Sequence, residues 1–185
     1  MYDVITGALE AGEADDAVAV HLVVGSDGVF CAGNDIQDFA KRATDLGAEG
    51  GASGLIRTLP TLDKPLIAAV DGLAIGIGVT MLFHCDLVYA SPSASFRTPF
   101  LDLGLVMEAG SSLIAPQIMG HQRAFELLCL GEAFNAEAGA RAGFVNRIVP
   151  AESLEAEALA AAERLSAKPR AALVAAKRLM KNGQR

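Results

Sequence analysis

The sequence predicts an α/β protein in which buried strands form a parallel sheet. Two runs of Val, Ile, Leu and Ala, Val18–Val24 and Leu66–Val70, carry almost no charge, as strands buried on both faces do. Segments with helical spacing separate the strand-like runs, and parallel strands need such right-handed crossovers. The chain has 185 residues, of which 52% are hydrophobic, so it can form one domain with a sizeable core.

Hydrophobic spacing and breaker residues define the expected elements of the first part of the chain. Tyr2–Glu13 has apolar residues at helical spacing. Glycine clusters predict a connector over Asp45–Ser53, and Lys64-Pro65 ends a helix because the residue before proline disfavours helical geometry. The remaining elements up to the second buried strand are the strand Val18–Val24, a short helix over Ile36–Arg42, a helix over Leu55–Leu62 and the strand Leu66–Val70.

The second part continues the alternation and ends in helices. The segment Ser153–Ser166 opens with acidic residues, which favour the start of a helix. The other expected elements are a buried helix over Val79–His84, strands over Leu87–Ala90 and Ser95–Arg97, helices over Ser111–Met119, Arg123–Leu130 and Ala136–Ala142, a strand over Val145–Val149 and a helix over Arg170–Lys181.

Two glycine-bearing turns follow strand-like runs, Phe30–Asp35 in one case and Asp71–Gly78 in the other. Turns at strand ends can direct backbone N–H groups at one point. Two converging donors stabilise an oxyanion that develops on a carbonyl or thioester, and the loss of one donor costs about 3 kcal/mol of barrier lowering. The residues alone leave a second interpretation open, in which the glycines only turn the chain.

Composition excludes several classes of function. The net charge of −7 argues against a nucleic-acid-binding surface, which needs clustered Lys and Arg. No apolar run reaches membrane-spanning length, and no basic region precedes an apolar core at the N-terminus, so we expect a cytoplasmic protein. The three widely spaced cysteines predict reduced thiols and neither a metal site nor a disulfide framework. Basic residues near the end of the chain form either a solvated helix face or a phosphate-binding patch.

Four motifs occur in an order that resembles the crotonase (enoyl-CoA hydratase/isomerase) family. They are FCAGNDI, KPLIAAVDGLAIGIGVTMLFHCDLVYAS, SFRTPFLDLGLVMEAGSSLIAPQIMG and the stretch from Ala136 to Val149. The resemblance covers most of the chain and implies an α/β crotonase-like spiral of ββα units with C-terminal helices. Residues 1–150 would form the core domain and residues 151–185 a helical region for trimerisation, in a homotrimer or a dimer of trimers. Members usually begin with a strand pair and a segment that binds the CoA adenine; these strands are expected to be absent here.

The resemblance also implies an oxyanion hole made of backbone N–H groups. The matching positions are Asn34 and Ile77, and a helix beginning near Gly78 would direct its N-terminal dipole at the same place. The substrate is then an acyl-CoA thioester, with coenzyme A as part of the substrate and no separate cofactor. The residues expected to bind it are Ala32, Asp35, Ile36, Gly76, Phe100 and Leu105.

The carboxylates favour one reaction within this family. Crotonase-like hydratases use two glutamates, and Thr80 and Phe100 occupy those places here, neither of which can act as an acid or base near neutral pH. Glu108 instead matches the single glutamate of the isomerases that convert 3-enoyl-CoA to 2-enoyl-CoA. The sequence therefore predicts an isomerase with Glu108 as its base. A bland alternative is that Glu108 is a charge near the N-terminus of the Ser111 helix.

Other functions remain open at this point. Within the family, Glu108 could serve hydration or thioester hydrolysis, or the chain could be a non-catalytic acyl-CoA-binding relative. A serine hydrolase would need a nucleophile, a base and an orienting acid in mutual reach, for which Ser111, His121 and Asp102 are candidates. No nucleophile-elbow pattern surrounds that serine.

Overall fold

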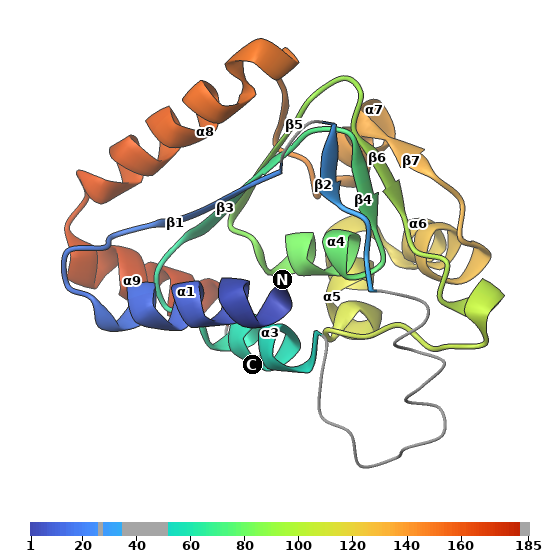
Figure 1. Cartoon of the computed structure of the whole chain (residues 1–185), viewed down its shortest axis with the longest axis horizontal. Coiled ribbons are helices and arrows are strands. Elements are labelled where there is room, and N and C mark those ends of the chain that lie inside the picture. The colour runs from blue at the N-terminus through green and yellow to red at the C-terminus, as the bar shows by residue number, and fades with distance from the viewer. Residues whose placement is uncertain (26–27, 35–51, 182–185) are drawn as a thin grey trace.

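The computed structural model describes residues 1–25, 28–34 and 52–181. Within these residues the strands form two four-stranded sheets, in the orders β1-β3-β5-β8 and β2-β4-β6-β7, which lie side by side in Figure 1. The strands are β1 (His21–Val24), β2 (Val29–Cys31), β3 (Leu66–Val70), β4 (Leu73–Ile75), β5 (Leu87–Ala90), β6 (Ser95–Arg97), β7 (Phe134–Asn135) and β8 (Arg147–Ile148).

Helices surround both sheets. The α-helices in the described part of the chain are α1 (Tyr2–Ala14), α3 (Ser53–Thr58), α4 (Ile77–Thr80), α5 (Ser111–Met119), α6 (His121–Phe125), α7 (Ala136–Ala142), α8 (Ala151–Ser166) and α9 (Arg170–Met180). Shorter helical turns are η1 (Leu59–Thr61), η2 (Met81–His84), η3 (Leu101–Leu103) and the π-helical η4 (Glu126–Leu130).

From β1 to β6, consecutive strands alternate between the two sheets, which produces the expected spiral of ββα units. β3 lies between β1 and β5 in the first sheet, and all three are parallel. β4 follows β3 directly but pairs with β2 and β6 in the second sheet, and α4 then leads the chain back toward the first sheet. Each turn of the spiral thus contributes one strand to each sheet, and this confirms the predicted fold class.

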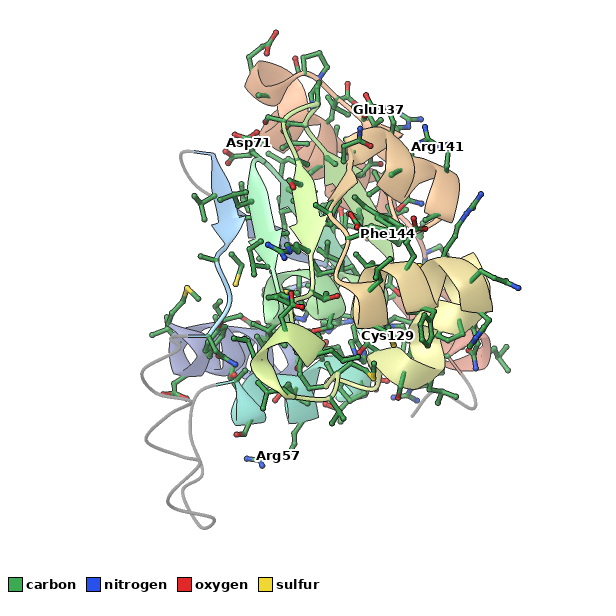
Figure 2. The ribbon with its side chains drawn as sticks, turned by 90° about the vertical axis from the view of Figure 1, so that its right-hand side faces the viewer. Arg57, Asp71, Cys129, Glu137, Arg141 and Phe144 are labelled. Atoms are coloured by element: carbon green, nitrogen blue, oxygen red, sulfur yellow. The ribbon has the colours of Figure 1, made fainter. Side chains whose placement is uncertain are left out.

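The expectation of one parallel sheet was wrong in two respects. There are two sheets in the described chain, and β6 pairs with β7 in the antiparallel direction. The stretch Asp71–Gly78 is also not a single turn, because β4 separates a tight turn at Asp71-Gly72 from a second turn at Gly76. Figure 2 shows Asp71 at the upper end of the strands, while Arg57 of α3 lies at the opposite end of the molecule. Strands of three residues are too short to show a hydrophobic period.

Other elements begin or end a few residues away from their predicted boundaries. The strand expected over Val18–Val24 is paired only from His21, and the one expected over Val145–Val149 is reduced to β8. The buried helix begins at Ile77 and ends in the 3₁₀ turn η2. The expected helix over Ile36–Arg42 lies outside the described residues, as does most of the connector before α3.

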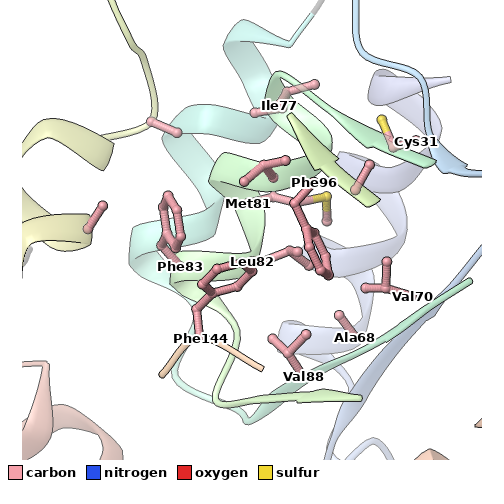
Figure 3. Packing of buried hydrophobic residues seen from close by; sticks show 14 of the residues in the cluster. Cys31, Ala68, Val70, Ile77, Met81, Leu82, Phe83, Val88, Phe96 and Phe144 are labelled. Carbon is pink, nitrogen blue, oxygen red and sulfur yellow. The ribbon is translucent and has the colours of Figure 1, made fainter. Parts of the chain in front are cut away.

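A cluster of phenylalanines fixes the position of the helix that follows β4. The ring of Phe144 meets the rings of Phe83 and Phe96 edge to face, with centroids 5.8 and 5.0 Å apart, and the same cluster contains Ile77 and Leu82 (Figure 3). Such ring pairs contribute about 0.5–1.5 kcal/mol each beyond their buried area. The cluster therefore ties α4 and η2 to β6 and to the segment that follows α7.

The C-terminal helices pack against the spiral. Leu154, Ala158 and Ala161 of α8 form a small core with Ile67 and Tyr89 of the first sheet, and Figure 1 shows α8 along one side of that sheet. Buried apolar contacts of this kind supply most of the stability of an amphipathic helix. No helix in the described ranges is long and apolar enough to cross a membrane.

The basic residues of α9 do not form one solvated face. Lys177 is only 3% exposed; its ammonium lies 2.7 Å from an Asp86 carboxylate oxygen and donates a hydrogen bond to the Lys64 carbonyl at 2.6 Å. Arg178, one residue further, is exposed and pairs with Asp63. The interpretation of a solvated face was thus wrong for Lys177, because tertiary packing buries this side chain between α9 and the residues around Lys64 and Asp86.

Candidate active site

The turn before α4 has a backbone geometry that requires glycine. Gly76 has φ 57° and ψ −115°, a region that is essentially restricted to glycine. Gly78, in the first turn of the helix, permits a close approach to β2, since a Cβ there would lie 2.7 Å from the Cys31 carbonyl oxygen. These two glycines bring the start of α4 against the end of β2.

Two backbone amides are consequently available at this junction. Ile77 is the first residue of α4, and the first N–H groups of a helix have no partner within the helix. Asn34 lies three residues beyond the end of β2. In the part of the chain that the structure describes, no backbone hydrogen bond uses the N–H of either residue.

Both residues line a largely apolar pocket of about 550 Å³, a volume that includes the space open to solvent at its mouth. Seven of the nine predicted site residues line it, whereas Asp35 and Ile36 lie outside the described residues. The full lining is Ala32, Gly33, Asn34, Ile75, Gly76, Ile77, Pro99, Phe100, Leu103, Leu105 and Glu108. Over the described ranges, no His, Cys, Asp and Glu side chains cluster as a metal site would require.

Glu108 is the one titratable side chain among these lining residues. Its Oε1 atom accepts a hydrogen bond from the Thr80 hydroxyl at 2.5 Å. Its Oε2 atom is buried and has no hydrogen-bond partner among the residues that the structure describes. Burial raises the pKa of the Glu108 carboxyl, and the hydrogen bond from Thr80 opposes that increase. A carboxylate in this environment is poised to take up a proton.

Hydrogen bonds to the backbone hold the loop that carries Glu108. Ala109 has φ 53°, which costs an L-residue about 1–2 kcal/mol. The Nε2 atom of His84 lies 2.7 Å from the Ala109 carbonyl oxygen, so this nitrogen carries the proton and donates it. Burial lowers the pKa of His84, which keeps the ring neutral. The Ser111 hydroxyl and amide donate to the Glu108 carbonyl at 2.6 and 3.0 Å.

Two contacts of Glu108's loop were missed by sequence reasoning. Thr80 was read only as the residue that replaces a glutamate, although it is in fact the partner of Glu108. His84 was read only as the end of a helix, although it holds the carbonyl of Ala109. Both pairs join residues at least 25 positions apart, and no local pattern in the sequence signals them.

One alternative for this region finds no support in the geometry. The serine-hydrolase triad is not assembled, because among the described residues no hydrogen bond joins any two of its members. Ser111 is fully buried and bonds the Glu108 carbonyl, Asp102 pairs with Arg97 at 3.4 Å, and His121 packs against Phe125. For the other alternative, α5 has Gly110 at its N-cap and no side-chain capping bond, so the Glu108 side chain does not cap that helix, and its role as a charge near the helix N-terminus stays an interpretation.

The fold and pocket define an α/β spiral in which one buried carboxyl and two backbone amides, neither bonded to backbone in the described part of the chain, lie at a common cavity. The family model for enoyl-CoA hydratase/isomerase matches residues 1–185. The chain therefore belongs to the enoyl-CoA hydratase/isomerase family and has the crotonase fold.

The relatives of this chain include both isomerases and hydratases. The chain is 37% identical over 162 residues to enoyl-CoA delta isomerase 2 of Rattus norvegicus, covering 85% of this chain and 41% of the relative. It is 31% identical over 169 residues to the mitochondrial enoyl-CoA hydratase of Pongo abelii, covering 90% and 57%. The chain thus spans about half the length of these two proteins.

Solved structures show the same fold. A Magnetospirillum magneticum protein assigned as an enoyl-CoA hydratase/carnithine racemase is 49% identical and superimposes with a TM-score of 0.92. The match covers 98% of this chain and 71% of that one. The likeness establishes the family and the architecture, whereas the reaction depends on the side chains in the pocket.

Proposed function

We propose that this chain is an acyl-CoA isomerase that moves the double bond of a 3-enoyl thioester to the conjugated 2-position. The observation that carries the proposal is the pocket: Glu108 is its single acid or base among the lining residues, and it shares the pocket with the amides of Asn34 and Ile77. One base is enough for an isomerisation, since the proton that it removes is the proton that it returns. The name of the rat relative, a delta isomerase, agrees with this assignment.

The mechanism requires two proton transfers. Glu108 removes a proton from C2, and the electron pair of that C–H bond delocalises onto the thioester oxygen. The N–H groups of Asn34 and Ile77 stabilise the resulting dienolate. The protonated Glu108 then gives the proton to C4 while the charge returns from the oxygen, which leaves the double bond between C2 and C3. The apolar walls formed by Phe100 and Leu105 exclude water and strengthen each of these interactions.

Hydration by a pair of glutamates is disfavoured by the same residues. Thr80 and Phe100 occupy the two places where the family's hydratases have carboxylates, and neither side chain titrates near neutral pH. Thr80 is, in addition, fully buried and already bonded to Glu108. The described lining residues therefore offer no second carboxylate to hold a water molecule together with Glu108.

Assembly, substrate and location are part of the same proposal. The substrate is an acyl-CoA thioester, with coenzyme A entering as part of that substrate. We propose a homotrimer, or a dimer of such trimers, with residues 151–185 at the interface beside the core of residues 1–150, and a cytoplasmic location. Sedimentation equilibrium measures the assembly directly, and a monomer at micromolar concentration would contradict it.

The test follows the ultraviolet absorbance of conjugated 2-enoyl-CoA as it forms from 3-enoyl-CoA. The wild type should isomerise, and Glu108→Gln should lose about 100- to 10,000-fold in kcat, the range for removal of a general base. Glu137→Gln is the matched control because this glutamate is exposed on α7, away from the pocket (Figure 2). Hydration of 2-enoyl-CoA and release of free CoA are assayed in parallel.

Each other outcome points to a different function. Hydration without isomerisation would reject the single-base mechanism, and free CoA would indicate a thioesterase. A folded protein that binds acyl-CoA without turnover would be the non-catalytic relative.

A further inference from the structure

The structure gives a specific role to Thr80, which ends the helix that begins with Ile77. Its side chain is fully buried and does not line the pocket. The hydroxyl lies behind Glu108 and donates to Oε1 at 2.5 Å, at the short end of the range for a hydroxyl bound to a carboxylate. A bond of this kind fixes both the position and the rotation of the carboxyl plane.

The two oxygens of Glu108 are thereby made unequal. Oε1 accepts the bond from Thr80, whereas Oε2 is buried and has no partner within the described ranges of the chain. Buried carboxylate oxygens are almost always hydrogen-bonded, and one that is not has an unused strong acceptor. Because the other described lining residues offer apolar groups and the backbone amides of Asn34 and Ile77, Oε2 is the oxygen left to receive a proton from a bound molecule.

We infer that Thr80 is a positioning residue that holds Oε1 so that Oε2 alone carries the proton between C2 and C4. This inference rests on the proposed isomerase function and goes further, because it assigns the proton to one oxygen. Oε1 accepts the Thr80 bond both when Glu108 is a carboxylate and when Oε2 is protonated. The carboxyl group can therefore deliver the proton to C4 without turning, and no proton is lost to water between the two steps.

Among the described residues, a titratable group on which Glu108 acts is Tyr2 of α1. The Tyr2 hydroxyl lies 3.8 Å from the Cys31 sulfur, and burial, with smaller contributions from Cys31 and Glu108, raises the pKa of Tyr2. His84 faces the neighbouring carbonyl and is neutral. Near neutral pH, Glu108 therefore has no charged neighbour among these groups, and the Thr80 bond is the contact that favours its ionised form.

The experiment compares Thr80→Val, which removes the hydroxyl at nearly constant volume, with Thr80→Ser, which keeps it. Thr58→Val is the matched control, since Thr58 is another buried threonine whose hydroxyl donates to a glutamate, Glu10, at 3.1 Å. Isomerisation is measured against pH, and the carboxyl of Glu108 is titrated directly by ¹³C NMR, with Glu108→Gln to assign its signal. Thr80→Ala replaces the valine variant if that variant does not fold.

The expected result has three parts. In Thr80→Val, kcat on the high-pH plateau falls about 10- to 100-fold, the contribution of a charge-assisted hydrogen bond, while KM changes little because Thr80 does not line the pocket. The pKa of Glu108 rises in both the rate profile and the NMR titration, because the bond favours the ionised form. Thr80→Ser keeps both kcat and the pKa of Glu108 near their wild-type values, and Thr58→Val changes neither.

Two results would overturn the inference and leave the proposed function intact, and a third would reject the proposed function itself. An unchanged plateau in Thr80→Val, with a wild type that isomerises through Glu108, rejects positioning by Thr80 but leaves the isomerase intact. A lowered plateau that Thr80→Ser does not restore means that the residue acts through packing. A wild type without isomerisation rejects the isomerase, and the proton-carrying role of Oε2 with it, even if NMR still detects the Thr80 bond.

Discussion

Replacement of Lys177 by methionine should destabilise the protein far more than its place in a basic helix suggests. The ammonium is buried, lies 2.7 Å from Asp86 and donates to the Lys64 carbonyl. Removal of one partner of a buried ion pair costs about 3–5 kcal/mol because the other charge is left uncompensated. Asp86 is 23% exposed and keeps Lys181 at 4.0 Å, and the Leu66 amide still donates to it at 2.8 Å. We therefore expect Lys177→Met to lower the free energy of unfolding by about 2–3 kcal/mol.

Urea denaturation followed by circular dichroism measures this loss of unfolding free energy, and thermal denaturation measures the change in Tm. For a chain of this size, each kcal/mol lowers Tm by about 2–4 °C, so we expect Tm to fall by about 4–12 °C. Arg178→Met is the matched control on the same helix, because Arg178 is exposed and its pair with Asp63 is open to solvent. A Lys177→Met protein as stable as the wild type, or an equal loss in Arg178→Met, would refute this account of α9.

Two further predictions concern the pocket. Burial raises the pKa of Glu108 in the folded state, so the stability that this group contributes falls as pH rises from its unfolded pKa through its folded pKa. Glu108→Gln should therefore be more stable than the wild type at pH 7, and urea denaturation at pH 4 should show a smaller difference between the two proteins. A difference that does not depend on pH would contradict the prediction. Gly76→Ala and Gly143→Ala both place an alanine at positive φ (57° and 92°) and should each lose about 1–3 kcal/mol of stability. Only Gly76→Ala should also lose about 100-fold in kcat, as expected when the Ile77 N–H is misdirected, and equal kcat values for the two variants would exclude a role for this turn.

Much of the architecture could be read from the residues. β3 and β5 were located because apolar, β-branched runs between breakers are the strongest strand signal, and the helices over 111–119 and 136–142 matched α5 and α7. The placement of the pocket residues was also predictable, since the ordered motifs carry the family's arrangement with them. Glu108, Asn34 and Ile77 come from three separate motifs, and the fold brings all three to one cavity.

The tertiary structure decided what no local pattern records. β4 is a strand because it pairs with β2 and β6, and β7 because it pairs with β6; a strand of two or three residues has no periodicity of its own. Lys177 is buried because Asp86 and the Lys64 carbonyl, far away in sequence, offer it partners. The same holds for the Thr80–Glu108 bond. The sequence by itself indicated that the carboxyl of Glu108 would lie near the backbone of Asn34 and Ile77. Only folding determined which of its two oxygens has no partner among the described residues, because that depends on a contact between distant side chains.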